Sequence, residues 1–156
     1  KGKAWGFDAG IQFDWGVNKY SQLSLGFSLL DGLDTRFREV EGSRELPNQE
    51  MYINGGMAWT QKFYFLEYSL SADFHPINTH LDYRRKLHFG ASLGIPFIKF
   101  FGGWNGGYPS YGVEFKLFIF RVVAGFYAVE TGSNYKDEKG SRALLYLNLF
   151  NFSFDL

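Results

Sequence analysis

The chain has 156 residues, and its 16 basic and 16 acidic side chains cancel, which argues against a basic surface for nucleic acid. It contains no cysteine, which excludes disulfides and thiolate metal sites, and no apolar run approaches the roughly 20 residues of a membrane-spanning helix. Aromatic residues reach 21% and glycines number 19, a composition that favours strands separated by turns.

The first predicted strand, over residues 5–15, has an alternating pattern. Its apolar positions are Trp5, Phe7, Ala9, Ile11, Phe13 and Trp15, and polar or very small residues stand between them. Because successive side chains of a strand point to opposite faces, this order gives one apolar face and one polar face. A helical period would mix the two sets of residues.

The same alternation predicts eight further strands. They cover approximately residues 20–30, 51–60, 63–73, 85–94, 96–104, 110–118 and 120–130, and the last strand starts near Arg142. The strand over 96–104 is less regular, because Phe97 and Phe101 share a face with Lys99. In the last strand the apolar parity switches after Leu149, which either a β-bulge or the end of the strand would explain.

The predicted connections alternate in length. Short links fall at residues 16–19, 61–62, 94–96 and 118–119, and longer ones at 31–50, 74–84, 105–109 and 131–140. Short periplasmic turns alternating with longer external loops are typical of bacterial outer-membrane barrels. On this interpretation the C-terminus is periplasmic and the first strand starts outside. Since single-chain bacterial barrels normally have an even number of strands, we expect an odd number of further strands before Lys1, in the same polypeptide or another one.

The polar face of these strands is assigned to a barrel lumen. Its candidate residues are Asp8, Asp14, Glu67, Asp73, Lys86, His88, Lys99, Glu114, Lys116, Arg121 and Arg142. Such charges either line a water-filled path or pair across strands and plug the barrel. Glu114 and Lys116 lie near Arg121 across a short hairpin, which favours pairing.

The apolar face is assigned to lipid, with aromatic residues near the strand ends. The predicted membrane-interface aromatics are Trp5, Trp15, Tyr20, Trp59, Tyr64, Trp104 and Tyr111. Trp and Tyr prefer the bilayer interface, and strands of about 9–11 residues match its tilted span. A soluble barrel also alternates, but it points its apolar side inward and packs it mostly with aliphatic residues.

No catalytic constellation stands out. His75 and His80 fall on a predicted loop, where solvated histidines are the expectation and a metal site with Asp73 or Asp82 is the alternative. His88 and Ser92 share the lumen face, but no acidic or amide group is placed to orient the histidine. We therefore predict no enzyme activity, no cofactor and no metal site.

Four segments carry a resemblance to outer-membrane barrels. The alternating C-terminal residues Phe150, Phe152, Phe154 and Leu156 resemble the signal that the barrel-assembly machinery recognises, with Leu156 in place of the usual terminal aromatic residue. The segments Gly6-Phe7-Asp8-Ala9-Gly10-Ile11 and Leu23-Ser24-Leu25-Gly26-Phe27-Ser28 together resemble a hairpin of the fatty-acid-transporter-like superfamily of outer-membrane barrels. The segment 105–112 and the strands that follow it resemble C-terminal hairpins of the same superfamily. The lumen hatch segment of its transporter members is not in this chain, so their transport mechanism is not carried over.

The sequence thus predicts an all-β protein in which residues 1–156 form one antiparallel transmembrane β-barrel segment, part of a larger barrel with an even number of strands, in the bacterial outer membrane. The expected function is a channel or transporter, or the membrane anchor of a larger envelope assembly. The alternatives are a sealed structural barrel with no transport role and a soluble β-barrel ligand-binding module. The expected partners are outer-membrane lipid, the barrel-assembly machinery during biogenesis and other envelope proteins, with no nucleic acid.

Overall fold

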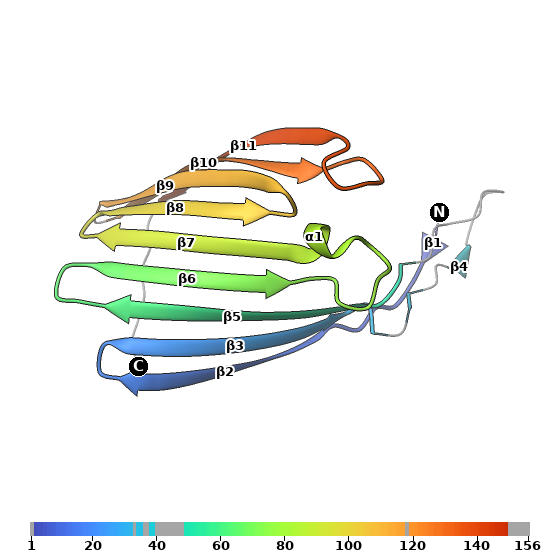
Figure 1. The fold of residues 1–156 in the computed structure, drawn as a ribbon, viewed down its shortest axis with the longest axis horizontal. Coiled ribbons are helices and arrows are strands. Elements are labelled where there is room, and N and C mark those ends of the chain that lie inside the picture. Colours follow the sequence, from blue (N-terminus) through green and yellow to red (C-terminus); the bar gives the residue numbers. More distant parts are fainter. Residues whose placement is uncertain (1, 33, 36–37, 40–48, 118, 150–156) are drawn as a thin grey trace.

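A computed structural model describes residues 2–32, 34–35, 38–39, 49–117 and 119–149. Nine long strands dominate it (Figure 1). They are β2 (Ala9–Asn18), β3 (Ser21–Leu30), β5 (Tyr52–Lys62), β6 (Glu67–Phe74), β7 (Leu87–Ile95), β8 (Ile98–Asn105), β9 (Tyr108–Leu117), β10 (Phe120–Glu130) and β11 (Lys139–Leu149). The two-residue strands β1 (Gly2–Lys3) and β4 (Arg38–Glu39) pair with each other, and α1 (Tyr83–Lys86) is a single helical turn.

The long strands form one antiparallel sheet in which each strand pairs with its neighbour along the chain. The order is β11-β10-β9-β8-β7-β6-β5-β3-β2. The predicted all-β class and the nine antiparallel strands are therefore confirmed. The sheet is open, because β2 and β11 lie at opposite edges and do not pair with each other. Within the described residues, no helix is long and apolar enough to cross a membrane.

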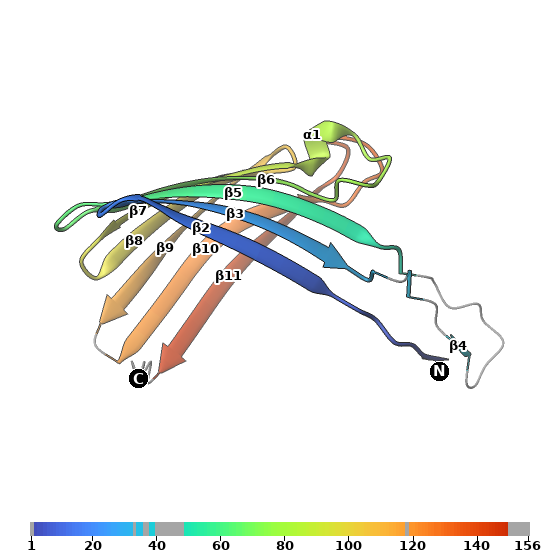
Figure 2. The ribbon, with the colours of Figure 1, turned by 90° about the horizontal axis from the view of Figure 1, so that it is seen from below.

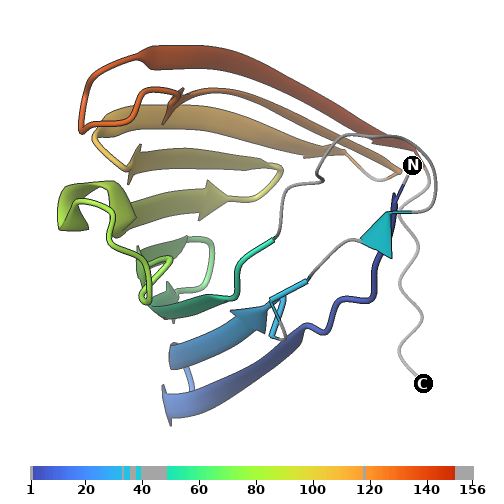
Figure 3. The ribbon, with the colours of Figure 1, turned by 90° about the vertical axis from the view of Figure 1, so that its right-hand side faces the viewer.

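The sheet is strongly twisted and curved. Figure 2 shows β2 and β11 running in clearly different directions. Seen along the strands in Figure 3, the sheet bends from β2 through β7 to β11 into an open trough. A right-handed twist that accumulates from strand to strand is the ordinary geometry of antiparallel sheets, and it is the same geometry that closes barrels.

The two ends of the sheet differ. At one end, called here the turn end, short connections join β2 to β3, β5 to β6, β7 to β8 and β9 to β10. At the other, called the loop end, longer stretches of chain separate β3 from β5, β6 from β7 and β10 from β11. The predicted longer link at 105–109 is wrong, since β8 and β9 are joined by Gly106 and Gly107 alone. Both glycines have positive φ, 54° and 110°, which a tight two-residue hairpin turn requires.

Two predicted strand starts need correction. The first long strand begins at Ala9 rather than Trp5. Before it, the Gly32 amide donates to the Phe7 carbonyl and the Asp31 amide donates to the Asp8 carboxylate, so both residues bind the segment after β3 instead of the sheet. The strand predicted over 63–73 begins at Glu67. Residues 63–66 form the turn before it, which a hydrogen bond of 2.6 Å from the Phe63 amide to the Leu66 carbonyl closes.

Strand pairing sorts the side chains into two faces. One face, called here the apolar face, holds the odd-numbered residues of β2, β3, β5, β7, β9 and β11 and the even-numbered residues of β6, β8 and β10. In the described strands its only charged residues are Glu130 and Lys139, which pair at the loop end. The opposite, polar face holds the other charged residues of the long strands. In β7 and β8 the polar face is the less exposed one, which places it on the concave side of the trough.

The described residues place no second layer on the sheet and form almost no core. Among the described residues, Tyr108 and Ala128 are the only apolar ones that are buried. Water-soluble domains cover the apolar side of a sheet with another sheet or with helices. Here large apolar side chains of every long strand remain exposed, so the protein as described does not bury its own apolar face.

Glycines set how closely neighbouring strands approach on the polar face. A Cβ added at Gly112 would lie 2.9 Å from the Ala124 carbonyl oxygen and 3.3 Å from the Gly125 Cα, which are backbone atoms that cannot turn away. A Cβ added at Gly102, on the apolar face of β8, would meet nothing within 4 Å. We therefore expect Gly112→Ala to lower the free energy of unfolding by about 1–3 kcal/mol. Gly102→Ala should have little effect when both variants are unfolded in guanidinium under the same conditions.

Candidate functional site

The apolar face is continuous across all nine long strands. Directly paired residues of neighbouring strands form apolar rows, for example Phe13, Leu25 and Met57 on β2, β3 and β5. The row continues through Ala72 and Phe89 on β6 and β7. Met57, near the middle of β5, is 55% exposed. Large contiguous apolar surfaces are where proteins contact lipid, ligands or other proteins, so this face is a candidate contact surface.

The predicted interface aromatics gather at the two ends of the strands. Trp15, Tyr20, Trp59 and Tyr64 lie at or near the turn end, and Tyr64 is fully exposed in the turn before β6. Trp104 and Tyr111 lie toward the loop end of β8 and β9, and Trp5 precedes β2 at the same end. These aromatic residues therefore form two groups, one toward each end of the strands.

The polar face carries a row of charges near the turn end. Lys62, Glu67, Gly94, Lys99 and Glu114 occupy directly paired positions on β5, β6, β7, β8 and β9. The Lys99 ammonium lies 2.9 Å from the Glu67 carboxylate, and the Lys62 ammonium lies 3.5 Å from it. The bridge from β8 to β6 passes over Gly94 of β7, where a Cβ would lie 3.6 Å from the Lys99 Cγ. Sequence reasoning missed Gly94, because its role becomes visible only in the strand register.

Glu114 is the centre of a second set of ion pairs. The Arg121 guanidinium donates to its carboxylate at 2.7 Å, and the Lys116 ammonium lies 3.1 Å away. The Glu114 side chain is only 3% exposed, so this carboxylate depends on its two cations. The predicted pairing of these three residues is therefore confirmed. Lys62, Glu67, Lys99, Glu114, Lys116 and Arg121 are together called the charged belt.

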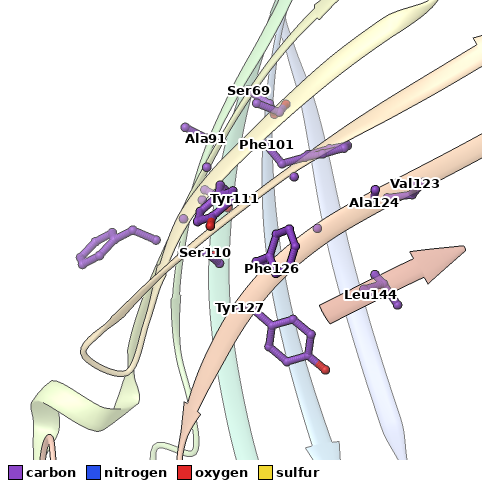
Figure 4. Close-up of a pocket in the computed structure, with 18 residues that line it drawn as sticks. Ser69, Ala91, Phe101, Ser110, Tyr111, Val123, Ala124, Phe126, Tyr127 and Leu144 are labelled. Carbon is purple, nitrogen blue, oxygen red and sulfur yellow. The ribbon is translucent and has the colours of Figure 1, made fainter. Parts of the chain in front are cut away.

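Small residues form the middle of the polar face. A groove of about 540 Å³ lies over the centre of β6 to β11 (Figure 4). The serines and glycines at its floor are Ser69, Ser71, Gly90, Ser92, Gly103, Ser110, Gly112 and Gly125. Phe101, Tyr127 and Leu144 are the larger polar-face residues beside it. The middle of this face therefore leaves room for water or solute.

Two histidines stack at the loop end. The rings of His75, just after β6, and His88, in β7, lie 3.9 Å apart and nearly parallel. Burial and the neighbouring His88 ring lower the pKa of His75 below its ordinary value. The buried Nε2 of His88 has no hydrogen-bond partner among the residues that the structure describes. Within the part of the chain that the structure describes, no group of three histidine, aspartate or glutamate side chains is placed to hold a metal ion.

The remaining lumen candidates have different surroundings. Asp14 lies on the polar face of β2 and accepts hydrogen bonds from Gln12. Asp73 pairs directly with His88 on the same face, and Arg142 shares that face on β11. Asp8 precedes β2 and accepts from the Asp31 amide.

Lys86 is not a strand residue. It ends α1, and its buried ammonium donates to the carbonyls of Ile77 and Thr79 at 3.2 and 2.6 Å. It therefore binds the loop between β6 and β7. The predicted assembly signal, Phe150, Phe152, Phe154 and Leu156, lies outside the described residues.

The loop-end connections hold one another in place. The Arg84 guanidinium lies 4.4 Å from the centre of the Tyr135 ring, and Arg85 donates to the Ser133 carbonyl. Arg84 also binds Asp82, which lowers the pKa of that carboxyl to about 2. The Glu130 carboxylate accepts from the Tyr108 hydroxyl and from three backbone amides of residues 132–138. The contacts of Arg84 with Tyr135 and of Arg85 with Ser133 join residues 75–86 to residues 131–138, and sequence patterns gave no signal for them.

Comparison with known proteins adds no relative from which a role could be taken. No protein-family model, curated protein or solved structure matches the chain.

Proposed function

We propose that the protein is an integral β-barrel of the bacterial outer membrane and that the nine long strands are part of the barrel wall. One observation carries this proposal: the exposed apolar face runs across every long strand, and in the described strands its only charged residues, Glu130 and Lys139, lie at the loop end. Strands of 8–11 residues and aromatic side chains near both ends suit a tilted crossing of the bilayer. In this arrangement lipid covers the surface that the protein itself leaves uncovered.

The open edges extend the proposal. The described edge strands, β2 and β11, have 10 and 11 residues, and each leaves one row of backbone groups without a partner strand. Within a bilayer every backbone polar group must be paired. Further strands, from the same polypeptide or another one, therefore complete the barrel in this proposal. The short turns would lie in the periplasm and the loop end outside the cell.

The concave face supports a role as a channel or transporter. Serines and glycines occupy its centre over β6 to β11. Most charged side chains lie toward its two ends, and Asp14 lies at the middle of β2. The segments that resemble the fatty-acid-transporter-like superfamily also favour a transport role, because that superfamily has transporter members. The partners in this proposal are outer-membrane lipid, the barrel-assembly machinery and other envelope proteins.

The ion pairs of the charged belt favour a second candidate, a sealed barrel that anchors a larger envelope assembly. Charges that bind one another across strands can narrow a lumen. Conductance of the full-length polypeptide in planar bilayers separates the two roles, since a sealed barrel gives no ion current.

Quenching by brominated lipids tests the membrane assignment itself. In a background where Trp5, Trp15, Trp59 and Trp104 are phenylalanine, a single tryptophan is introduced by Met57→Trp on the apolar face or by Gln12→Trp on the polar face. We expect lipids brominated deep in the acyl chains to quench the fluorescence of the Met57→Trp variant strongly and that of the Gln12→Trp variant weakly. Equal quenching of both, or none of either, would reject the proposed orientation.

A further inference from the structure

The charged belt contains more positive than negative groups. Its two carboxylates, Glu67 and Glu114, face four cations. Each carboxylate binds two cations, and the shorter contact is with Lys99 at 2.9 Å for Glu67 and with Arg121 at 2.7 Å for Glu114, against 3.5 Å for Lys62 and 3.1 Å for Lys116. One cation therefore remains in surplus beside each carboxylate.

The surplus cations are the exposed ones. The side chains of Lys62 and Lys116 are 65% and 61% exposed, whereas those of Lys99 and Arg121 are 28% and 39% exposed. The inner pair neutralises the two carboxylates, and the outer pair extends into solvent on the concave side. Lys62 and Lys116 both border one hollow at the turn end, which Phe63, Pro96 and Phe97 also line.

We propose that the charged belt is an anion-attracting rim at the turn end of the lumen, in which Lys62 and Lys116 favour small inorganic or organic anions over cations. This inference rests on the proposed channel role. Cationic side chains lining a pore favour anions through the local potential, and they do so most where the pore is narrow.

Three other charged groups lie on the polar face of the long strands. Asp14 on β2 is hydrogen-bonded to Gln12, and Asp73 and Arg142 lie nearer the loop end of their strands. None of these three forms an ion pair with the belt.

Reversal potentials in a potassium chloride gradient across planar bilayers measure the preference. The full-length protein should conduct with a chloride-to-potassium permeability ratio above one. The double variant Lys62→Gln/Lys116→Gln removes the surplus charge and leaves both inner ion pairs in place. At about 0.1 M salt a charge acts over a screening length of about 10 Å, so each lysine affects ions that pass close to it. We expect the double variant to lower the permeability ratio about threefold. Lys116→Glu should lower the ratio further than Lys116→Gln.

Lys139→Gln is the matched control, since it removes one cation at the opposite end of the sheet and on the apolar face. It should leave the permeability ratio unchanged. Heat-modifiable gel migration shows whether each variant is folded. A conducting wild type whose ratio does not change in the double variant overturns the anion-attracting rim and leaves the channel role standing. A correctly folded wild type that carries no current overturns both, while the quenching experiment still reports on membrane insertion.

Discussion

Replacing Met57 with arginine is expected to destabilise the protein in a lipid bilayer by about 2–4 kcal/mol. Met57 lies at the middle of β5 on the apolar face and is 55% exposed. If that face were in water, an arginine at so exposed a position would be nearly neutral, since surface substitutions usually change stability by less than about 0.5 kcal/mol. In a bilayer the guanidinium must lie in hydrocarbon or distort the lipid, so the same substitution is costly. The size of the effect therefore distinguishes the two surroundings.

The measurement is guanidinium unfolding from lipid vesicles, read by tryptophan fluorescence and by heat-modifiable gel migration. Tyr64→Arg is the matched control, because Tyr64 is fully exposed in the turn between β5 and β6 and would lie at the interface. There the expected cost is about 0–1 kcal/mol. Equal stability of wild type and Met57→Arg would contradict contact between this face and lipid.

Much of the fold could be predicted because a strand's side chains alternate with a period of two. The pattern of β10 predicts residues 120–130, and the structure has the strand over the same range. Even the irregular β8 follows the rule. Lys99 and Phe101 share the polar face, while Ile98, Phe100 and Trp104 continue the apolar face. The strand begins at Ile98, so Phe97 lies before it. From Ile98 onward the side chains alternate regularly between the two faces.

Features that depend on contacts distant in sequence could not be predicted in this way. In the sequence, Lys86 fits the alternating pattern of β7. In the structure it is the last residue of α1, and carbonyls of the preceding loop bind its ammonium. The turn over 63–66 interrupts an apolar run that looks like a strand. The role of Gly94 follows from register across three strands, which no single segment encodes. Pairing between Glu114, Lys116 and Arg121 was predictable, because a short hairpin fixes that register locally.

The second large effect is expected from Arg121. Arg121→Gln leaves the Glu114 carboxylate, 3% exposed, with only the Lys116 ammonium at 3.1 Å, and that lysine side chain is 61% exposed. Removing one partner of a buried ion pair costs up to about 3–5 kcal/mol. Because Lys116 remains, we expect a loss of about 2 kcal/mol in the free energy of unfolding.

Glu114→Gln should cost less than Arg121→Gln, about 1 kcal/mol, because it is the buried charge itself that is removed. The neutral amide keeps the shape of the side chain and still offers an oxygen to Arg121, whose guanidinium is partly hydrated at 39% exposure. The double variant Glu114→Gln/Arg121→Gln should then be more stable than Arg121→Gln alone, since no buried carboxylate is left without its partner.

Lys62→Gln, which removes an exposed cation, should change stability by less than about 1 kcal/mol and serves as the control. If Glu114→Gln proved the more damaging single change, the carboxylate would be a source of stability in its own right. The view that Arg121 chiefly compensates a buried charge would then be wrong.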